Sequence, residues 1–317
     1  MSKRLLALAI FFISFGSQAQ NMPRYGYYML NPSYFNPAWI GAQPEGFVAM
    51  QNRIKWLGYN SSFYSGGGAP NSQLLTGVIK IKNAPISAVG MNISNDMVGS
   101  ISNLQVLMPI SIPVHLRKGT LNIGIAPGIF NQTQNSNLLH PNEQGDPSIP
   151  SGRAVQMQMN LSSGLFYTSN RGWFVGVGAV NLLKPGFNYG LDSLQNKQAI
   201  TASVHGGFNV SFNGFKLSPN AIVTSYSNNI TFNLGSMIYI GDQIWSGLFY
   251  NSQESINLML GYKLLENNKL KVGYSFEYVV QNQNGKAPTT HELYLRYDLP
   301  NWVFGGKKSI KTPRFTY

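Results

Sequence analysis

A sustained alternation of apolar and small or polar residues is the feature of this sequence that most restricts its fold. It is clearest between residues 270 and 299. Large apolar or aromatic side chains occupy the even positions of 272–280, and the odd positions of 293–299 resume the pattern after a polar loop at 282–288. A period of two over about nine residues predicts an extended strand with one apolar and one polar face. The two stretches therefore predict a hairpin.

About fourteen such segments follow one another along the chain. The expected strands begin near Phe47, Ser72, Ile86, Ser100, Thr120, Arg153, Gly172, Ile200, Gly214, Ile230, Gln243, Glu254, Leu270 and Thr290. Connections after the even-numbered strands are mostly tight, whereas those after the odd-numbered strands include long ones at 57–71, 131–152 and 181–198. Short turns alternating with long loops are typical of outer-membrane barrels. We therefore predict an all-β fold: a transmembrane, antiparallel, up-and-down β-barrel of about 14 strands.

Composition agrees with a barrel in the bacterial outer membrane. Only 11% of residues are charged, 13% are aromatic, and glycine is abundant at 33 residues. The chain has no cysteine, so a disulfide framework is excluded. The net charge of +12 has no basic stripe to accompany it, and this does not favour nucleic acid as a partner.

The two ends of the chain differ from the alternating region. Residues 1–19 have a basic start, an apolar run and a small-x-small site ending at Ala19, which predicts a signal peptide. Residues 20–46 are aromatic and contain two Asn-Pro steps, and we expect this segment to pack on or in the barrel of residues 47–299. Residues 300–317 form a basic tail, and both termini are expected on the periplasmic side.

Three further expectations concern side chains on the barrel. Small residues on the polar face (Gly124, Gly176, Gly178 and Gly206) suit a lumen that is packed or wet. Three tryptophans near strand ends (Trp56, Trp173 and Trp245) suit an aromatic girdle, although packing alone explains any one of them. The expected periplasmic rim is basic, through Arg117, Lys118, Arg171, Lys263, Lys269, Lys271 and the tail. This rim is either a solvated edge near anionic lipid or a docking surface for a periplasmic partner.

Catalytic and metal-binding motifs are not apparent. The four histidines are scattered, without the spacing of a zinc site, and there is no nucleophile elbow, P-loop or dinucleotide fingerprint. We therefore expect no enzyme activity, no catalytic or metal-ligating residues and no cofactor. A hydrolase site assembled from distant strands stays open as a third interpretation, which cleavage by the purified protein would reveal.

Several motifs resemble one family. Residues 31–38 read Asn-Pro-Ser-Tyr-Phe-Asn-Pro-Ala, and Arg53 to Gly58 follow in the order Arg-Ile-Lys-Trp-Leu-Gly. Together they resemble the N-terminal signature of the PorP/SprF family of type IX secretion outer-membrane proteins. Weaker matches lie at 176–185, 217–219, 291–293 and 311–315. The family usually has Gly-Ala-Pro soon after the Trp-x-Gly, whereas here Gly-Ala-Pro comes at 68–70, after an inserted loop.

The resemblance implies a non-enzymatic barrel that serves type IX secretion and, in some members, gliding motility. It implies that the chain binds an exported protein, such as the C-terminal domain of an adhesin, and helps deliver or anchor it at the cell surface. Periplasmic or translocon components of type IX secretion are further expected partners. The alternative, suggested by the width of such a barrel, is a passive or ligand-specific transport channel.

Partner-binding candidates follow from the long loops and the basic tail. Long loops rich in glycine, proline and aromatic residues can capture an extended segment or a folded β domain. The candidates are Trp56, Tyr59, Phe63, Tyr64, Pro70, Phe187, Tyr189, Lys307, Lys308, Lys311 and Arg314.

Overall fold

The computed structural model describes residues 25–59, 68–82, 84–139, 152–189, 196–227, 229–253, 255–281 and 286–299. Most of them are in strands. The strands are β1 (Phe47–Ile54), β2 (Asn71–Lys80), β3 (Ala88–Val98), β4 (Ile101–Leu107), β5 (Ile110–Leu116), β6 (Gly119–Asn135), β7 (Arg153–Ser169), β8 (Trp173–Val180), β9 (Gly186–Phe187), β10 (Asn196–Lys197), β11 (Thr201–Phe208), β12 (Val210–Phe212), β13 (Phe215–Tyr226), β14 (Asn229–Ile240), β15 (Ile244–Asn251), β16 (Ser255–Leu264), β17 (Leu270–Val279) and β18 (Thr289–Asp298). The 3-10 helices are η1 (Pro32–Tyr34), η2 (Pro37–Ala42), η3 (Ser136–Leu138) and η4 (Glu266–Asn268). None of the helices in the described ranges has the length and apolar character needed to cross a bilayer.

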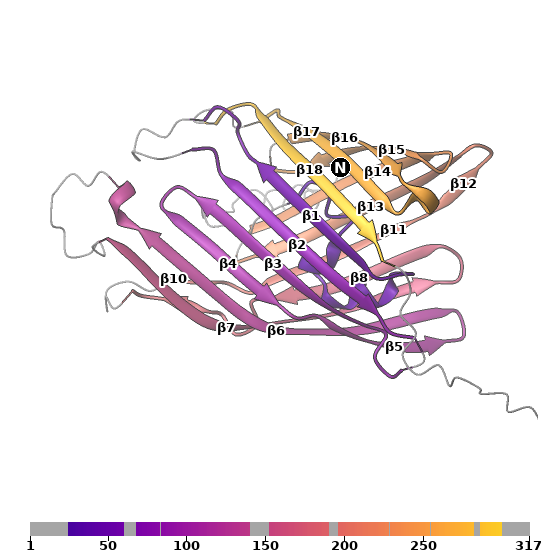
Figure 1. The fold of residues 1–317 in the computed structure, drawn as a ribbon, viewed down its shortest axis with the longest axis horizontal. Coiled ribbons are helices and arrows are strands. Elements are labelled where there is room, and N and C mark those ends of the chain that lie inside the picture. The colour runs from indigo at the N-terminus through magenta and orange to yellow at the C-terminus, as the bar shows by residue number, and fades with distance from the viewer. Residues whose placement is uncertain are drawn as a thin grey trace, which may run out of the picture.

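The strands close into one antiparallel barrel, with the last strand beside the first (Figure 1). β4 and β5 lie one after the other along β6, and both also pair with β3. β11 and β12 likewise lie one after the other along β13. Each of these two pairs therefore occupies one strand position in the ring. The closed barrel therefore has fourteen strand positions, and the predicted fold class is confirmed. The two-stranded β9–β10 ribbon is a separate sheet and is not one of the strand positions of this ring.

Alternation along each strand separates an outer apolar face from a polar lumen. In β1, Phe47, Ala49, Gln51 and Arg53 are buried, whereas Val48 and Met50 are exposed. Exposed Val, Ile, Leu and Met side chains recur in the same way around the ring and form the surface that faces lipid. Because successive side chains point to opposite faces of a strand, the buried polar residues of the same strands line the interior.

The two ends of the barrel have different connections. We call the end where β1 begins the turn end, because β5 and β6, β7 and β8, and β12 and β13 are joined there by two or three residues. We call the opposite end the loop end, since the connections at 55–70, 136–152 and 181–200 lie there. The predicted loop at 131–152 starts too early, because residues 131–135 continue β6 in register with β7.

Of the three tryptophans expected near strand ends, Trp173 is exposed and Trp245 is buried. Trp173 begins β8 and is 43% exposed, packing against Tyr167. Trp245 does not join a girdle, because its side chain is buried inside the barrel against Tyr27 and Tyr294. Its indole lies over Gly261 and Gly273 of neighbouring strands, where an added Cβ would overlap it.

Candidate functional site

The lumen is filled by residues 25–46, which we call the plug. The plug enters the barrel interior and leads directly into β1, as the indigo segment in Figure 1 shows. All residues from Asn31 to Gly41 are buried. Each Asn-Pro step places proline at the start of a 3-10 helix, where its fixed backbone angle is favourable and its missing N–H costs nothing. The plug is therefore a compact, ordered structure of short turns.

Asparagine and serine side chains bond the plug to the wall. The Asn31 amide donates to Thr76 Oγ1 at 2.9 Å and to Gln51 Oε1 at 3.3 Å. The Asn36 amide nitrogen donates to the Leu165 carbonyl at 2.9 Å and lies 3.1 Å from His205 Nε2. Since an unsatisfied polar group in this interior would be costly, these bonds hold both the position and the orientation of the plug.

A buried ionic cluster lies where the plug begins. Arg53 of β1 contacts Glu277 of β17 at 2.5 Å and Glu292 of β18 at 3.1 Å, with all three side chains almost fully buried. Glu292 also accepts hydrogen bonds from the backbone N–H of Gly26 at 2.6 Å and of Tyr27 at 3.4 Å. One cation and two carboxylates thus join the first strand, the last two strands and the plug.

Glycines allow the plug to approach the wall closely. An added Cβ at Gly124 would overlap the backbone of Pro37 and Ala38, and one at Gly178 would overlap the backbone of Phe35 and Asn36. The small residues predicted for the lumen therefore serve as contact surfaces for the plug at these positions. Of the two expected alternatives, a packed or a wet lumen, the lumen at these positions is packed.

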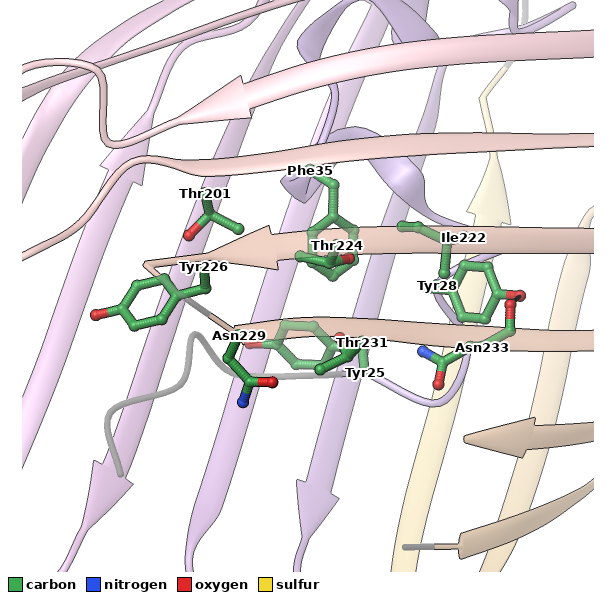
Figure 2. A pocket seen from close by; sticks show the side chains of 10 residues that line it. All are labelled: Tyr25, Tyr28, Phe35, Thr201, Ile222, Thr224, Tyr226, Asn229, Thr231 and Asn233. Atoms are coloured by element: carbon green, nitrogen blue, oxygen red, sulfur yellow. Dashed lines mark hydrogen bonds between the residues drawn. The ribbon is translucent and has the colours of Figure 1, made fainter. Parts of the chain in front are cut away.

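Plug tyrosines pack against the opposite wall. Tyr27 contacts Trp245 and Tyr294, and Tyr28 contacts Phe249 and donates to Asn220 Oδ1 at 3.0 Å. Burial raises the pKa of Tyr28 above its usual value. Figure 2 shows Tyr25, Tyr28 and Phe35 facing the inner surface of β13 and β14 across a narrow pocket.

A larger cavity of about 400 Å³ separates the plug from one side of the wall. Its lining includes Trp39, Phe174 and Tyr239 together with Lys216 and Arg296. The ammonium group of Lys216 lies 5.6 Å from the centre of the Tyr239 ring, and the Arg296 guanidinium lies 3.9 Å from that of Phe47. Since Lys216 and Arg296 both lie near the turn end, this cavity combines aromatic surface with positive charge.

The structure brings the predicted basic residues to the turn end. Arg117 and Lys118 join β5 to β6, Arg171 joins β7 to β8, and Lys263 and Lys269 lie near the connection from β16 to β17. Lys271 pairs with Asp298 at 2.7 Å. The tail residues Lys307, Lys308, Lys311 and Arg314 lie outside the described residues.

At the loop end, Trp56 organises a small cationic and aromatic cluster. Its ring packs against Tyr59, and the ammonium groups of Lys55 and Lys286 lie 5.1 and 5.3 Å from its centre. Its backbone is left-handed, with a φ of 53°, and its N–H donates to Thr290 Oγ1. Pro70 is buried, and its carbonyl accepts the N–H of Lys55. Phe63 and Tyr64 lie outside the described residues.

The segment around β9 packs against the inner face of the β6–β7 hairpin. Phe187 is buried against Phe130, so its ring supports this segment and does not reach a surface. The Tyr189 hydroxyl donates to Gln132 Oε1 at 2.8 Å, and the backbone N–H of Tyr189 donates to Gln156 Oε1. Burial raises the pKa of Tyr189 to about 12.

The ionic cluster and the turn-end cavity are features that the sequence analysis did not identify. A signal for the cluster was present, because Glu277 and Glu292 lie on the polar face of the hairpin predicted at 270–299. Their pairing with Arg53 joins residues separated by 224 and 239 positions, which no local pattern specifies.

Comparison with known sequences gives one family. The model of the family described as type IX secretion system membrane protein PorP/SprF matches residues 17–297. No curated protein matches the chain significantly.

Solved structures with similar folds are bacterial barrels. The toluene transporter TbuX of Ralstonia pickettii superimposes with a TM-score of 0.52 at 10% identity, covering 86% of this chain and 93% of that one. The toluene transporter TodX of Pseudomonas putida has a TM-score of 0.46 at 9% identity, covering 88% and 94%. Omp33, an outer membrane protein of Acinetobacter baumannii, has a TM-score of 0.42 at 8% identity, covering 80% and 99%. The likeness to TbuX supports the fold alone.

Proposed function

The chain belongs to the type IX secretion system membrane protein PorP/SprF family, and from this premise we propose that it is an outer-membrane adaptor. In this role the barrel binds an exported protein at its loop end and helps deliver or anchor that protein at the cell surface. The partner proposed is the C-terminal domain of an adhesin. No catalytic step is part of the proposal.

The observation that carries the proposal is the filled lumen. Residues 25–46 occupy the interior and are bonded to strands around the barrel, including β1, β2, β7 and β18. A barrel whose interior is filled and bonded in this way is a rigid scaffold. Binding residues are commonly found on loops that a rigid scaffold positions. The long connections at the loop end, with the Trp56 cluster and the Tyr189 segment, supply the proposed docking surface.

The proposal orients the molecule with the loop end outside the cell. Short turns on the periplasmic side and long loops on the outer side are the usual arrangement of outer-membrane barrels. The chain then has both termini in the periplasm. The basic turn end would face periplasmic components of the secretion system, and a cluster of positive charge favours encounter with acidic partners.

Comparing the surface proteins of cells with and without this protein tests the proposal. Loss of one large surface protein would support a dedicated adaptor, whereas loss of many would support a general secretion component. Loss of none would contradict both. Deletion of residues 140–151, which leaves β6 and β7 intact, should release the exported protein while the barrel still assembles. Unchanged retention by that variant would exclude this loop as the contact.

A second candidate function is a passive or ligand-specific channel. The 400 Å³ cavity beside the plug favours it, since a small ligand fits a space of that size. The transporter TbuX shares the fold, which is compatible with this role. Conductance in planar bilayers separates the two functions. Steady currents through the purified wild-type protein would favour the channel, and silence would favour the filled adaptor.

A further inference from the structure

β7 has a stretch of unpaired edge at the loop end. Along its whole length, Arg153 to Ser169, it pairs with β6. On its other side β8 pairs only with residues 163–168, and the carbonyl of Leu161 accepts the N–H of Leu182. Among the described residues, nothing pairs with the backbone of 153–160 on that side. Within the described part of the chain, β7 therefore has a free strand edge about eight residues long.

The direction of the Leu161 carbonyl identifies the free backbone groups. In an antiparallel ladder, alternate residues direct their N–H and C=O groups to opposite neighbours. Leu161 points away from β6, so Met159, Met157 and Val155 do so too. Toward that side these three residues present donors and acceptors that no described residue pairs with, at a spacing that matches an extended peptide.

The two faces beside this edge differ in polarity. The side chains of Val155, Met157 and Met159 are 57%, 62% and 74% exposed on the outer face. On the inner face, Gln156 is bonded to the backbone of Asn188 and Tyr189. A strand added here would therefore place apolar side chains outward and polar ones inward.

Part of this edge extends beyond the lipid. β7 has 17 residues, which at about 3.3 Å each and a tilt of about 40° span roughly 43 Å along the membrane normal. The apolar band of such barrels is about 25 Å tall. Figure 1 shows β6 and β7 reaching past the neighbouring strands toward the loop end. The tip of the edge is therefore accessible from the aqueous side.

A second edge in the same barrel, on β5, is protected. β5 pairs with β3 only at Ser111 and Ile110, which leaves the rest of its β3-facing side open. The N–H of Ser87 donates to the carbonyl of Ser111, so Ser111 and Pro113 both face that side. Pro113 has no N–H to offer, and proline is a common protection of edge strands. The free edge of β7 has no proline.

A second copy of this chain does not fit the edge. Copies inserted in the same direction are related by a rotation about the membrane normal. Such a rotation preserves the inclination of β7, so two β7 strands would cross at about twice their tilt, roughly 80°. Strands that cross at this angle cannot share a hydrogen-bonded ladder. A second copy is therefore not the occupant that we propose.

We propose that the backbone edge of residues 153–160 in β7 receives an extended, alternately apolar and polar strand of the exported partner, which extends the barrel sheet by one strand. This inference rests on the proposed function, because it specifies how the exported protein is held. Main-chain hydrogen bonds would supply affinity, and the apolar face at Met157 and Met159 would supply selectivity for alternating sequences.

The test uses the exported protein that disappears from the surface when this barrel is deleted. Met157→Pro removes a donor on the free edge and leaves the β6 ladder intact, as Pro113 does in β5. We expect it to lower surface retention of that protein at least about tenfold, since the ring also blocks neighbouring bonds. Met157→Ala removes the same apolar side chain but keeps the donor, so it isolates the side-chain contribution, and its loss of retention should be several-fold smaller than that of Met157→Pro. Heat-modifiable electrophoretic mobility confirms that each variant has folded.

Because the chain has no cysteine, Val155→Cys and Met157→Cys each provide a single labelling site. A benzophenone maleimide on either cysteine should cross-link to the same exported protein in intact cells. Adducts with another copy of the barrel, or with lipid alone, would overturn the inference. So would wild-type retention by a folded Met157→Pro variant. If deletion of the barrel removes no surface protein, the proposed function itself fails, which is a different result.

Discussion

The close approach of the plug to Gly124 gives a quantitative prediction for Gly124→Ala. The added Cβ would overlap the backbone nitrogen and Cα of Ala38 and would lie 2.6 Å from the carbonyl carbon of Pro37, whereas ordinary contact begins at 3.4 Å. The plug must therefore retreat by close to 1 Å. This movement stretches the bond from Ser111 Oγ to the Ala38 carbonyl, now 3.2 Å. It also stretches the bond from the Asn36 amide to the wall, now 2.9 Å.

Two weakened hydrogen bonds and the strain of overpacking together predict a loss of about 2–4 kcal/mol in the free energy of unfolding. For a protein of this size, that corresponds to a fall of roughly 5–10 °C in the melting temperature. The measurement is heat-modifiable mobility of the purified barrel in detergent. Gly77→Ala is the matched control, because nothing lies within 4 Å of its added Cβ. Equal melting temperatures for the two variants would refute a tightly packed plug.

Three further predictions follow from the interior and the two ends. Arg53→Met should lower the free energy of unfolding in urea by about 3–5 kcal/mol, because it leaves two buried carboxylates without their cation. Tyr189→Phe should increase amide exchange in the β9 segment, since the bond to Gln132 is lost, with no change in barrel melting. Lys216→Glu combined with Lys263→Glu should weaken co-purification of periplasmic secretion components, and unchanged recovery would exclude the basic turn end as their contact.

The strands of this barrel could be predicted from the sequence because their cause is local. Alternation with a period of two specifies which side chains face lipid, and glycine, proline and asparagine mark the turns. All fourteen expected strand positions have a counterpart, with starts that differ by no more than two residues. The end of β6 was placed too early, because residues 131–135 read as a polar loop yet pair fully with β7.

Features that depend on residues distant in the sequence could not be predicted from local patterns. The inward direction of Trp245 depends on a space created by Gly261 and Gly273 on two other strands. The Arg53 cluster requires β1 to lie beside β18, which closure of the ring alone determines. The free edge of β7 arises from the stagger between β7 and β8, and a one-sequence pattern contains no information on that register.

The bond between Gly26 and Glu292 has a consequence for how the protein is made. It joins residues 266 positions apart, so the bond that holds this turn cannot form until the last strand is present. The plug continues directly into β1, and β18 pairs with β1 to close the ring around it. A chain truncated before residue 289 would leave Arg53 without one of its two carboxylates and the opening of the cylinder unsealed. Closure of the wall and anchoring of the chain's first described turn thus depend on the same last strand.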